Sequence, residues 1–125
     1  MNLLSIDFGL KHIGLAISSG PLAEPFTQFP NDHKTISRII EICRIQKIDK
    51  IIIGLSENQM AKKTKDFAKI LEKKLNTPII FQDETLTSHQ ARRYLIQSGA
   101  KKKKRQEKDH QIAAAIILQS YIDEL

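Results

Sequence analysis

The sequence has no tryptophan, a single cysteine and no hydrophobic run long enough to cross a membrane. Its aromatic side chains are limited to 5 Phe and 2 Tyr, so platforms on which nucleic-acid bases could stack are scarce. The lone Cys43 excludes an internal disulfide, and its isoleucine neighbours indicate a buried thiol. A membrane-spanning helix needs about 20 apolar residues. We therefore expect a cytoplasmic protein with no membrane segment, and the N-terminus carries no signal-peptide pattern.

The excess of positive charge is local. Lys and Arg number 20 against 14 Asp and Glu, a net charge of +6. Five of the positive charges form the run KKKKR at residues 101–105, and without it the balance is 15 − 14 = +1. A local basic run is either a contact for a phosphate backbone or a solvated loop that keeps the protein in solution. The run by itself favours neither interpretation.

The pattern of apolar residues predicts one α/β domain over residues 1–125. Strands are expected at residues 2–8, 12–18, 23–29, 50–55 and 78–84. Helices are expected from Asn31 or Asp32 to about Lys47, at 61–75, from Thr87 or Ser88 to Gly99, and at 106–125. This order predicts a mixed sheet, antiparallel among the first three strands and parallel among the rest, with helices packed on its faces. Pro25 suits an edge strand.

Acidic residues stand at the ends of two expected strands and at the start of the last helix. Asp7 ends the first strand, Asp83 and Glu84 end the fifth, and Asp109 lies in the first turn of the helix. Ligand sites of α/β sheets gather at the carboxyl ends of parallel strands, so we expect Asp7, Glu84 and Asp109 to converge. Converging carboxylates repel unless a cation compensates them, and oxygen ligands suit Mg²⁺ or Mn²⁺. Each acid alone could equally cap a turn or a helix.

Four segments in register carry a family resemblance: SIDFGLKHIGLAIS, IIIGL, FQDETLTSHQA and KDHQIAAAIILQSYID. They resemble the YqgF/RuvX family of Holliday junction resolvases and pre-16S ribosomal RNA nucleases, in the RNase H-like superfamily. The resemblance spans nearly the whole chain and implies a five-stranded RNase H-like fold and a two-metal-ion nuclease. It makes Asp7, Glu84 and Asp109 the catalytic metal ligands, with Asp83 a less favoured choice. The sequence departs from the family pattern at Leu10 and in the glycine-free loop after Leu55.

Basic residues near these acids are expected to hold the phosphates of a nucleic acid, recognised by backbone and shape rather than base sequence. The expected contacts are Lys11, Arg92, Arg93, Lys101, Lys102, Lys103, Lys104 and Arg105. The partner implied by the resemblance is a structured RNA precursor, with 5′-end processing of 16S ribosomal RNA as first choice, or branched DNA. A resolvase that makes paired cuts is expected to be a homodimer, whereas an RNA-processing enzyme could act as a monomer.

Two other functions are compatible with parts of the sequence. A strand followed by Asp-x-Gly and a hairpin also opens actin-like ATPases and sugar kinases, but those proteins need two such domains. A non-catalytic RNA-binding module could use the basic run alone, although acids beside a phosphate hinder binding unless a metal compensates them. The four histidines, scattered along the chain, are expected in surface or hydrogen-bonding roles. Of these, only His110 adjoins a candidate acid, Asp109.

Overall fold

The computed structural model describes residues 1–55, 60–83 and 102–125, and the side chains of all of these except 102–108. The expected helix ending at Gly99 and the loop after Leu55 lie outside the described residues. The strands are β1 (Leu3–Phe8), β2 (His12–Ser18), β3 (Glu24–Pro30), β4 (Lys50–Leu55) and β5 (Ile79–Asp83). The helices are α1 (Thr35–Ile45), α2 (Met60–Lys74) and α4 (Lys102–Asp123).

The strands form one five-stranded sheet in the order β3-β2-β1-β4-β5. The pairs β1–β2 and β2–β3 are antiparallel, and the pairs β1–β4 and β4–β5 are parallel. The predicted mixed sheet is therefore confirmed. Strand β3 is an edge strand, as Pro25 predicted, because a proline has no N–H to offer a further neighbour.

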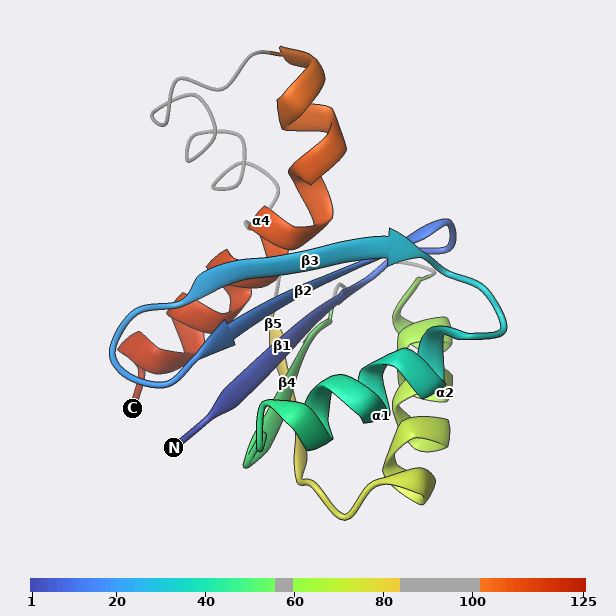
Figure 1. Ribbon diagram of the computed structural model, residues 1–125, viewed down its shortest axis with the longest axis vertical. Helices are drawn as coiled ribbons and strands as arrows, with labels where there is room; N and C mark the ends of the chain where they lie inside the picture. Colours follow the sequence, from blue (N-terminus) through green and yellow to red (C-terminus); the bar gives the residue numbers. More distant parts are fainter. Residues whose placement is uncertain (56–59, 84–101) are drawn as a thin grey trace.

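Helices cover both faces of the sheet. Figure 1 shows α1 and α2 on one side and α4 on the other. Successive side chains of β1 point to opposite faces of the sheet. Leu4 and Ile6 belong to the core beneath α1 and α2, whereas Leu3 belongs to the core beneath α4. Ser5 also points toward α4, and its buried hydroxyl donates a hydrogen bond to the carbonyl of Ala114. Each face of the sheet thus has its own apolar core, and the two cores share the strands between them.

Helix α1 begins later than predicted, at Thr35, and its cap residue Lys34 makes no side-chain capping bond. The two expected caps are engaged elsewhere. Asn31 donates from its side chain to the Gly9 carbonyl, over 2.8 Å. Asp32 forms a turn, in which its carboxylate accepts the N–H of Lys34. Both side chains are used by the loop that leads into the helix, so the prediction of a cap at Asn31 or Asp32 was wrong.

Helix α4 begins earlier than predicted, because the expected basic loop is mostly helical. Residues Lys102 to Arg105 lie in its first turns rather than in a loop, consistent with the good helix propensity of lysine and arginine. In Figure 1 the first part of α4 stands away from the sheet and the remainder packs along it. Among the residues described, no helix is long and apolar enough to span a membrane.

Candidate nuclease site

Asp7 lies near the carboxyl end of β1, on the face of the sheet that α4 covers. Strand alternation sets this direction, because Leu3, Ser5 and Asp7 are two residues apart and share one face. The side chain of Asp7 is only 14% exposed. A carboxylate at this depth needs a partner for its charge, and its nearest partner comes from the opposite end of the chain.

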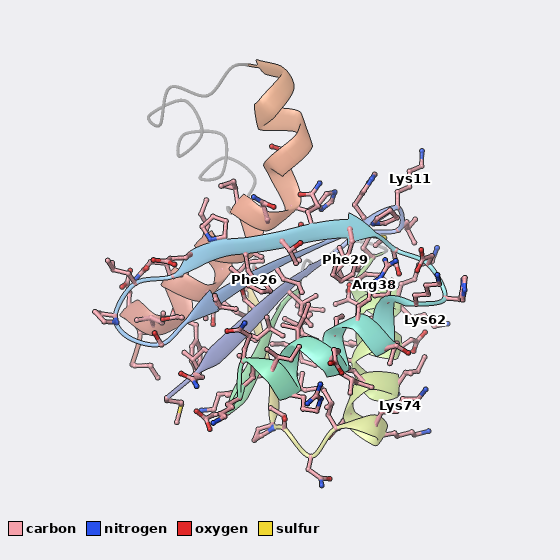
Figure 2. All side chains as sticks on the ribbon, viewed as in Figure 1. Lys11, Phe26, Phe29, Arg38, Lys62 and Lys74 are labelled. Atoms are coloured by element: carbon pink, nitrogen blue, oxygen red, sulfur yellow. The ribbon has the colours of Figure 1, made fainter. Side chains whose placement is uncertain are left out.

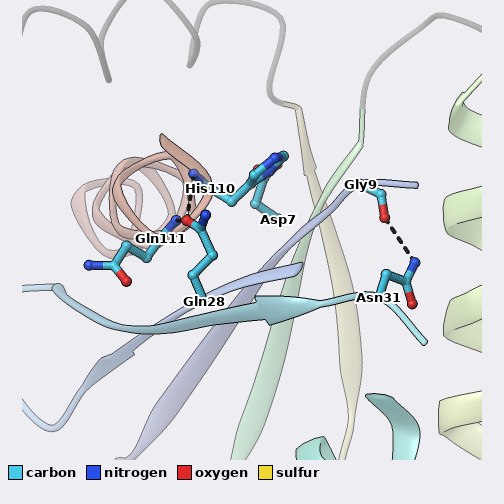
Figure 3. Close-up of polar contacts among 6 residues, drawn as sticks. All are labelled: Asp7, Gly9, Gln28, Asn31, His110 and Gln111. Carbon is cyan, nitrogen blue, oxygen red and sulfur yellow. Dashed lines mark hydrogen bonds and ion pairs between the residues drawn. The ribbon is translucent and has the colours of Figure 1, made fainter. Parts of the chain in front are cut away.

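That partner is His110, in the part of α4 that meets the sheet. Its Nδ1 lies 2.8 Å from Oδ2 of Asp7, and its side chain is 35% exposed. Figure 3 shows the two side chains side by side above the end of β1. The contact joins residues 103 positions apart in the sequence. The sequence predicted surface or hydrogen-bonding roles for the four histidines and a meeting of Asp7 with Asp109, and an approach of His110 to the site was the less favoured alternative.

Two glycines allow α4 to come this close. A Cβ placed on Gly14 of β2 would lie 2.1 Å from the backbone carbon of His110. A Cβ on Gly9 would lie 2.6 Å from the His12 carbonyl oxygen and 3.0 Å from Cε1 of the His110 ring. Any larger residue at position 14 would push the helix off the sheet, because real Cβ atoms do not approach backbone atoms so closely. The glycines of the first motif therefore set the distance between Asp7 and His110.

Gln28 on the edge strand β3 fixes the same turn of the helix. Its side-chain oxygen accepts hydrogen bonds from the backbone N–H groups of both His110 and Gln111, each over 3.1 Å (Figure 3). A side-chain acceptor inserted at backbone N–H groups is a common cause of a change in helix direction. Gln28 thus anchors α4 where it turns onto the sheet. No motif in the sequence singles out Gln28.

Asp109 is exposed on the surface of α4. Successive residues of an α-helix point about 100° apart, so Asp109 and His110 leave the helix in different directions. It is His110 that points at Asp7. The structure thus brings Asp7 together with the residue after Asp109.

The carboxyl ends of β1, β4 and β5 meet at one edge of the sheet, as expected. Ile6 pairs with Ile53, and Ile53 with Phe81, which puts Asp7, Gly54 and Gln82 in the next row. Asp83 follows Gln82 and therefore projects from the opposite face to Asp7, the face of α1 and α2. Its side chain is exposed. Glu84, the favoured acid of this pair, lies outside the described residues.

Of the predicted phosphate contacts, Lys11 is the one whose side chain the structure describes. Lys11 is exposed in the β1–β2 turn next to the site, and Figure 2 shows it extending away from the molecule. The side chains of Lys102, Lys103, Lys104 and Arg105, and all of Arg92, Arg93 and Lys101, lie outside the described part. A second basic surface, which was not among the predicted contacts, lies on α2. It consists of Lys62, Lys63, Lys65, Lys69, Lys73 and Lys74.

The donor set of the site is compatible with a divalent cation but incomplete in the described residues. Asp7 offers carboxylate oxygen, the ligand type preferred by Mg²⁺ and Mn²⁺, and His110 offers an imidazole nitrogen beside it. Among the side chains described, no group of three or more His, Cys, Asp or Glu is arranged to hold a metal. A further donor would have to come from the segment that begins at Glu84.

The sheet order, the acid near the end of β1 and the helix that meets it define an RNase H-like α/β protein. Two solved resolvase structures share this architecture across almost their whole length. The Fowlpox virus resolvase, in complex with Holliday junction DNA, matches with a TM-score of 0.63 at 19% identity and covers 99% of this chain and 98% of its own. RuvC of T. thermophilus, with a Holliday junction substrate, matches with a TM-score of 0.60 at 14% identity, covering 99% and 96%.

The chain belongs to the RuvX family. The family model described as "Holliday junction resolvase" matches residues 1–124. A relative from Sulfurihydrogenibium sp. (strain YO3AOP1), named "Putative pre-16S rRNA nuclease", is 38% identical over an alignment 133 positions long, and this alignment covers 98% of this chain and 90% of the relative. A relative of the same name from Listeria monocytogenes serotype 4b is 32% identical over an alignment 135 positions long, which covers 98% of each chain. The resemblance stated from the four sequence segments is confirmed.

Proposed function

We propose that this protein is a metal-dependent nuclease that hydrolyses phosphodiester bonds, with the 5′ region of precursor 16S ribosomal RNA as its first substrate class. The observation that carries the proposal is the position of Asp7. It lies near the carboxyl end of β1, it is largely buried, and its carboxylate contacts His110 of α4. Membership of the RuvX family and the names of the relatives support the same reaction.

We propose Asp7, Glu84 and Asp109 as metal ligands, Asp109 being the exposed carboxylate one residue before the contact of His110 with Asp7. Asp7 is held on the α4 face, and Asp83 faces the other way, which favours its neighbour Glu84 as the acid contributed by the end of β5. Divalent cations at such a site supply positive charge to the scissile phosphate and lower the pKa of water. Mg²⁺ or Mn²⁺ fits the carboxylate oxygens.

The remaining residues of the site bind and orient. We propose that Lys11, exposed in the turn beside Asp7, contacts a phosphate near the cleaved bond. The basic run at the start of α4 is placed in sequence just before the segment that meets Asp7, so it contacts phosphates farther along the same nucleic acid. Arg92 and Arg93 are proposed as additional phosphate contacts. Such contacts fix the position of the backbone and leave the base sequence largely unread.

Branched DNA is the second substrate class. It is favoured by the description of the family model, and the two resolvases with the same fold are named for Holliday junctions. A likeness of fold does not decide a substrate. A resolvase needs two sites for its paired cuts, so this reading predicts a symmetric dimer.

One experiment separates the substrates. Purified protein is offered a precursor 16S RNA 5′ leader and a four-way DNA junction, each with Mg²⁺, with Mn²⁺ and with a chelator. We expect metal-dependent cleavage of the RNA leader by wild type and none by Asp7→Asn. Cleavage of the junction alone would assign the protein to DNA. Metal-independent binding of either substrate, with no cleavage under any condition, would replace the nuclease with a non-catalytic binding module.

A further inference from the structure

We propose that Leu10 packs against the face of an unpaired base, next to the phosphate that Lys11 contacts, an inference that rests on the proposed function. Leu10 is the middle residue of the turn between β1 and β2, and it is 55% exposed. Lys11 follows it and is also exposed. The turn therefore presents an apolar side chain and a cation as neighbours, directly after the strand that carries Asp7.

The fold does not account for a leucine at this position. Turns favour Gly, Asn, Asp, Ser and Pro, each for a backbone or hydrogen-bonding reason that leucine does not share. Leu10 belongs to none of the apolar clusters that the described residues form. An exposed leucine is ordinary on a protein surface, so exposure by itself assigns no role. The reasons to assign one are the neighbours of Leu10 and the rigidity of its turn.

Asn31 holds the turn rigidly. It follows the edge strand β3, and its side chain donates a hydrogen bond to the Gly9 carbonyl over 2.8 Å. Figure 3 shows this bond. The backbone N–H of Asn31 donates to the Lys11 carbonyl, also over 2.8 Å. One residue thus binds the turn on both sides of Leu10.

The loop that carries Asn31 is itself fixed. Pro30 precedes Asn31 and restricts the backbone there. The N–H of Asp32 donates to the hydroxyl of Thr35 over 2.9 Å, and Thr35 is only 1% exposed. Leu10 therefore stands in solvent on a support that is ordered before a ligand arrives. An apolar contact of this kind costs less conformational entropy on binding than one made by a mobile segment.

The face of a base is the apolar surface that a nucleic acid offers beside a phosphate. Unpaired bases commonly stack on aromatic side chains, but Phe8, next to the turn, packs on Phe67 in the core with ring centroids 4.8 Å apart. Leu10 is thus the apolar side chain that the turn exposes, and leucine is among the residues that proteins place against bases. Every base has such a face, so the contact positions the strand without reading its sequence.

The test measures binding of labelled single-stranded RNA and of DNA of the same sequence by fluorescence anisotropy. Ca²⁺ replaces Mg²⁺ to prevent cleavage. We expect Leu10→Ser to weaken binding by about three- to tenfold, the loss expected when the exposed part of one leucine side chain stays in water. The slope of log K against log salt should not change, because an apolar contact releases no counterions. Lys11→Gln should instead lower this slope by about 0.7.

Leu22 provides the matched control. It is 71% exposed in the turn between β2 and β3, at the opposite end of β2 from Leu10 (Figure 1). Leu22→Ser removes the same side chain from the same kind of turn, and it should bind both strands as wild type does. Thermal unfolding of the two serine variants checks that both remain folded.

Strands that lack one base identify the contact. The abasic position is moved along the strand one nucleotide at a time. At the contacted position, wild type and Leu10→Ser should bind equally, because the surface that Leu10 covers is absent. At the other positions the difference between the two proteins should persist. The base face is common to RNA and DNA, so the same pattern is expected with each strand that wild type binds.

The outcomes separate this inference from the function on which it rests. Leu10→Ser that binds every strand as tightly as Leu22→Ser would overturn the inference, and so would a loss of equal size on all the abasic strands. Neither result affects the nuclease, which is judged by Mg²⁺-dependent cleavage in wild type. If wild type shows the contact at one base and never cleaves, the contact stands and the nuclease fails. If wild type binds no strand, both fail.

Discussion

Gly14 of β2 lies against the backbone of His110 in α4, so closely that there is no room for a side chain on the glycine. A Cβ at position 14 would lie 2.1 Å from the His110 backbone carbon and oxygen. The same turn of α4 is held by the side-chain oxygen of Gln28. The geometry of the candidate site is therefore decided by how α4 rests on β2 and β3, in addition to the residues that carry its chemistry.

Replacing Gly14 by alanine should destabilise the protein by about 1–3 kcal/mol or more, because the added methyl meets backbone atoms that cannot rotate away. Denaturant unfolding measures the change. The matched control is Gly20→Ala, since a Cβ at Gly20 meets nothing within 4 Å, and its effect should stay within about 1 kcal/mol. Equal stability of the two variants would contradict the close approach of α4 to β2.

Asp7→Asn should preserve the fold and remove cleavage. The amide is nearly isosteric and can still accept a hydrogen bond from His110, but it does not carry the charge that binds a divalent cation. We expect the rate to fall at least about a hundredfold, since the metal contributes several kcal/mol to such reactions. Single-turnover cleavage with Mg²⁺ measures this rate, and circular dichroism checks the fold.

The control for this substitution is Asp66→Asn, which removes the same charge from an exposed position on α2. Its turnover should match that of wild type. A purified Asp7→Asn protein that cleaves at the wild-type rate would remove Asp7 from the site.

Neutralising the basic run should flatten the salt dependence of nucleic-acid binding. Each phosphate contact contributes about 0.7–0.9 to the slope of log K against log salt. Changing Lys101, Lys102, Lys103, Lys104 and Arg105 to glutamine should therefore reduce the slope by up to about 4 if all of them contact phosphate. Fluorescence anisotropy over a series of KCl concentrations gives the slope.

The basic surface of α2 provides a control with the same change in net charge, because it lies on the other face of the sheet from α4 (Figures 1 and 2). The control variant replaces Lys62, Lys63, Lys69, Lys73 and Lys74 by glutamine. It should alter the slope much less than the first variant. A larger effect of the α2 variant would mean that the nucleic acid follows α2 and that the run at residues 101–105 is only solvated surface.

Cys43 should make the protein less stable at alkaline pH. Burial among the side chains under α1 raises the pKa of its thiol to about 11, from 9.0. The folded state therefore keeps the proton that the unfolded state loses, so the contribution of the thiol is fully present below pH 9 and is lost as the pH rises toward 11. The loss should reach about 2 kcal/mol.

The measurement is the free energy of unfolding of wild type and Cys43→Ala between pH 8 and pH 11. Because other groups titrate in this range in both proteins, only the difference between the two curves reports the thiol. The difference should shrink as the pH rises. Curves that stay parallel over the whole range would show that Cys43 is not shielded from water in the folded state.

Much of the fold could be predicted from local pattern. The bounds of β2 and β4 agree with the prediction, because alternation and a continuous apolar run are strong local signals. The start of α1 was missed since Asn31 bonds the Gly9 carbonyl, a contact across 22 residues. The start of α4 was missed since a run of like charges was taken for a loop, although lysine and arginine are good helix formers.

The sequence by itself determined the sheet and the family and singled out Asp7 as a candidate, because strand periodicity and four motifs in register are properties of the chain read in order. Only the tertiary structure decided which residue of the last helix meets Asp7. Neighbouring positions on a helix point about 100° apart, and the rotation of α4 is fixed by Gly14 and Gln28, which come from two other strands. The apolar pattern of α4 carries part of this information, because His110 shares a helix face with the buried Ala114 and Ile117. The close approach at Gly14 and the hydrogen bonds to Gln28, which fix the helix on the sheet, appear only in the folded molecule.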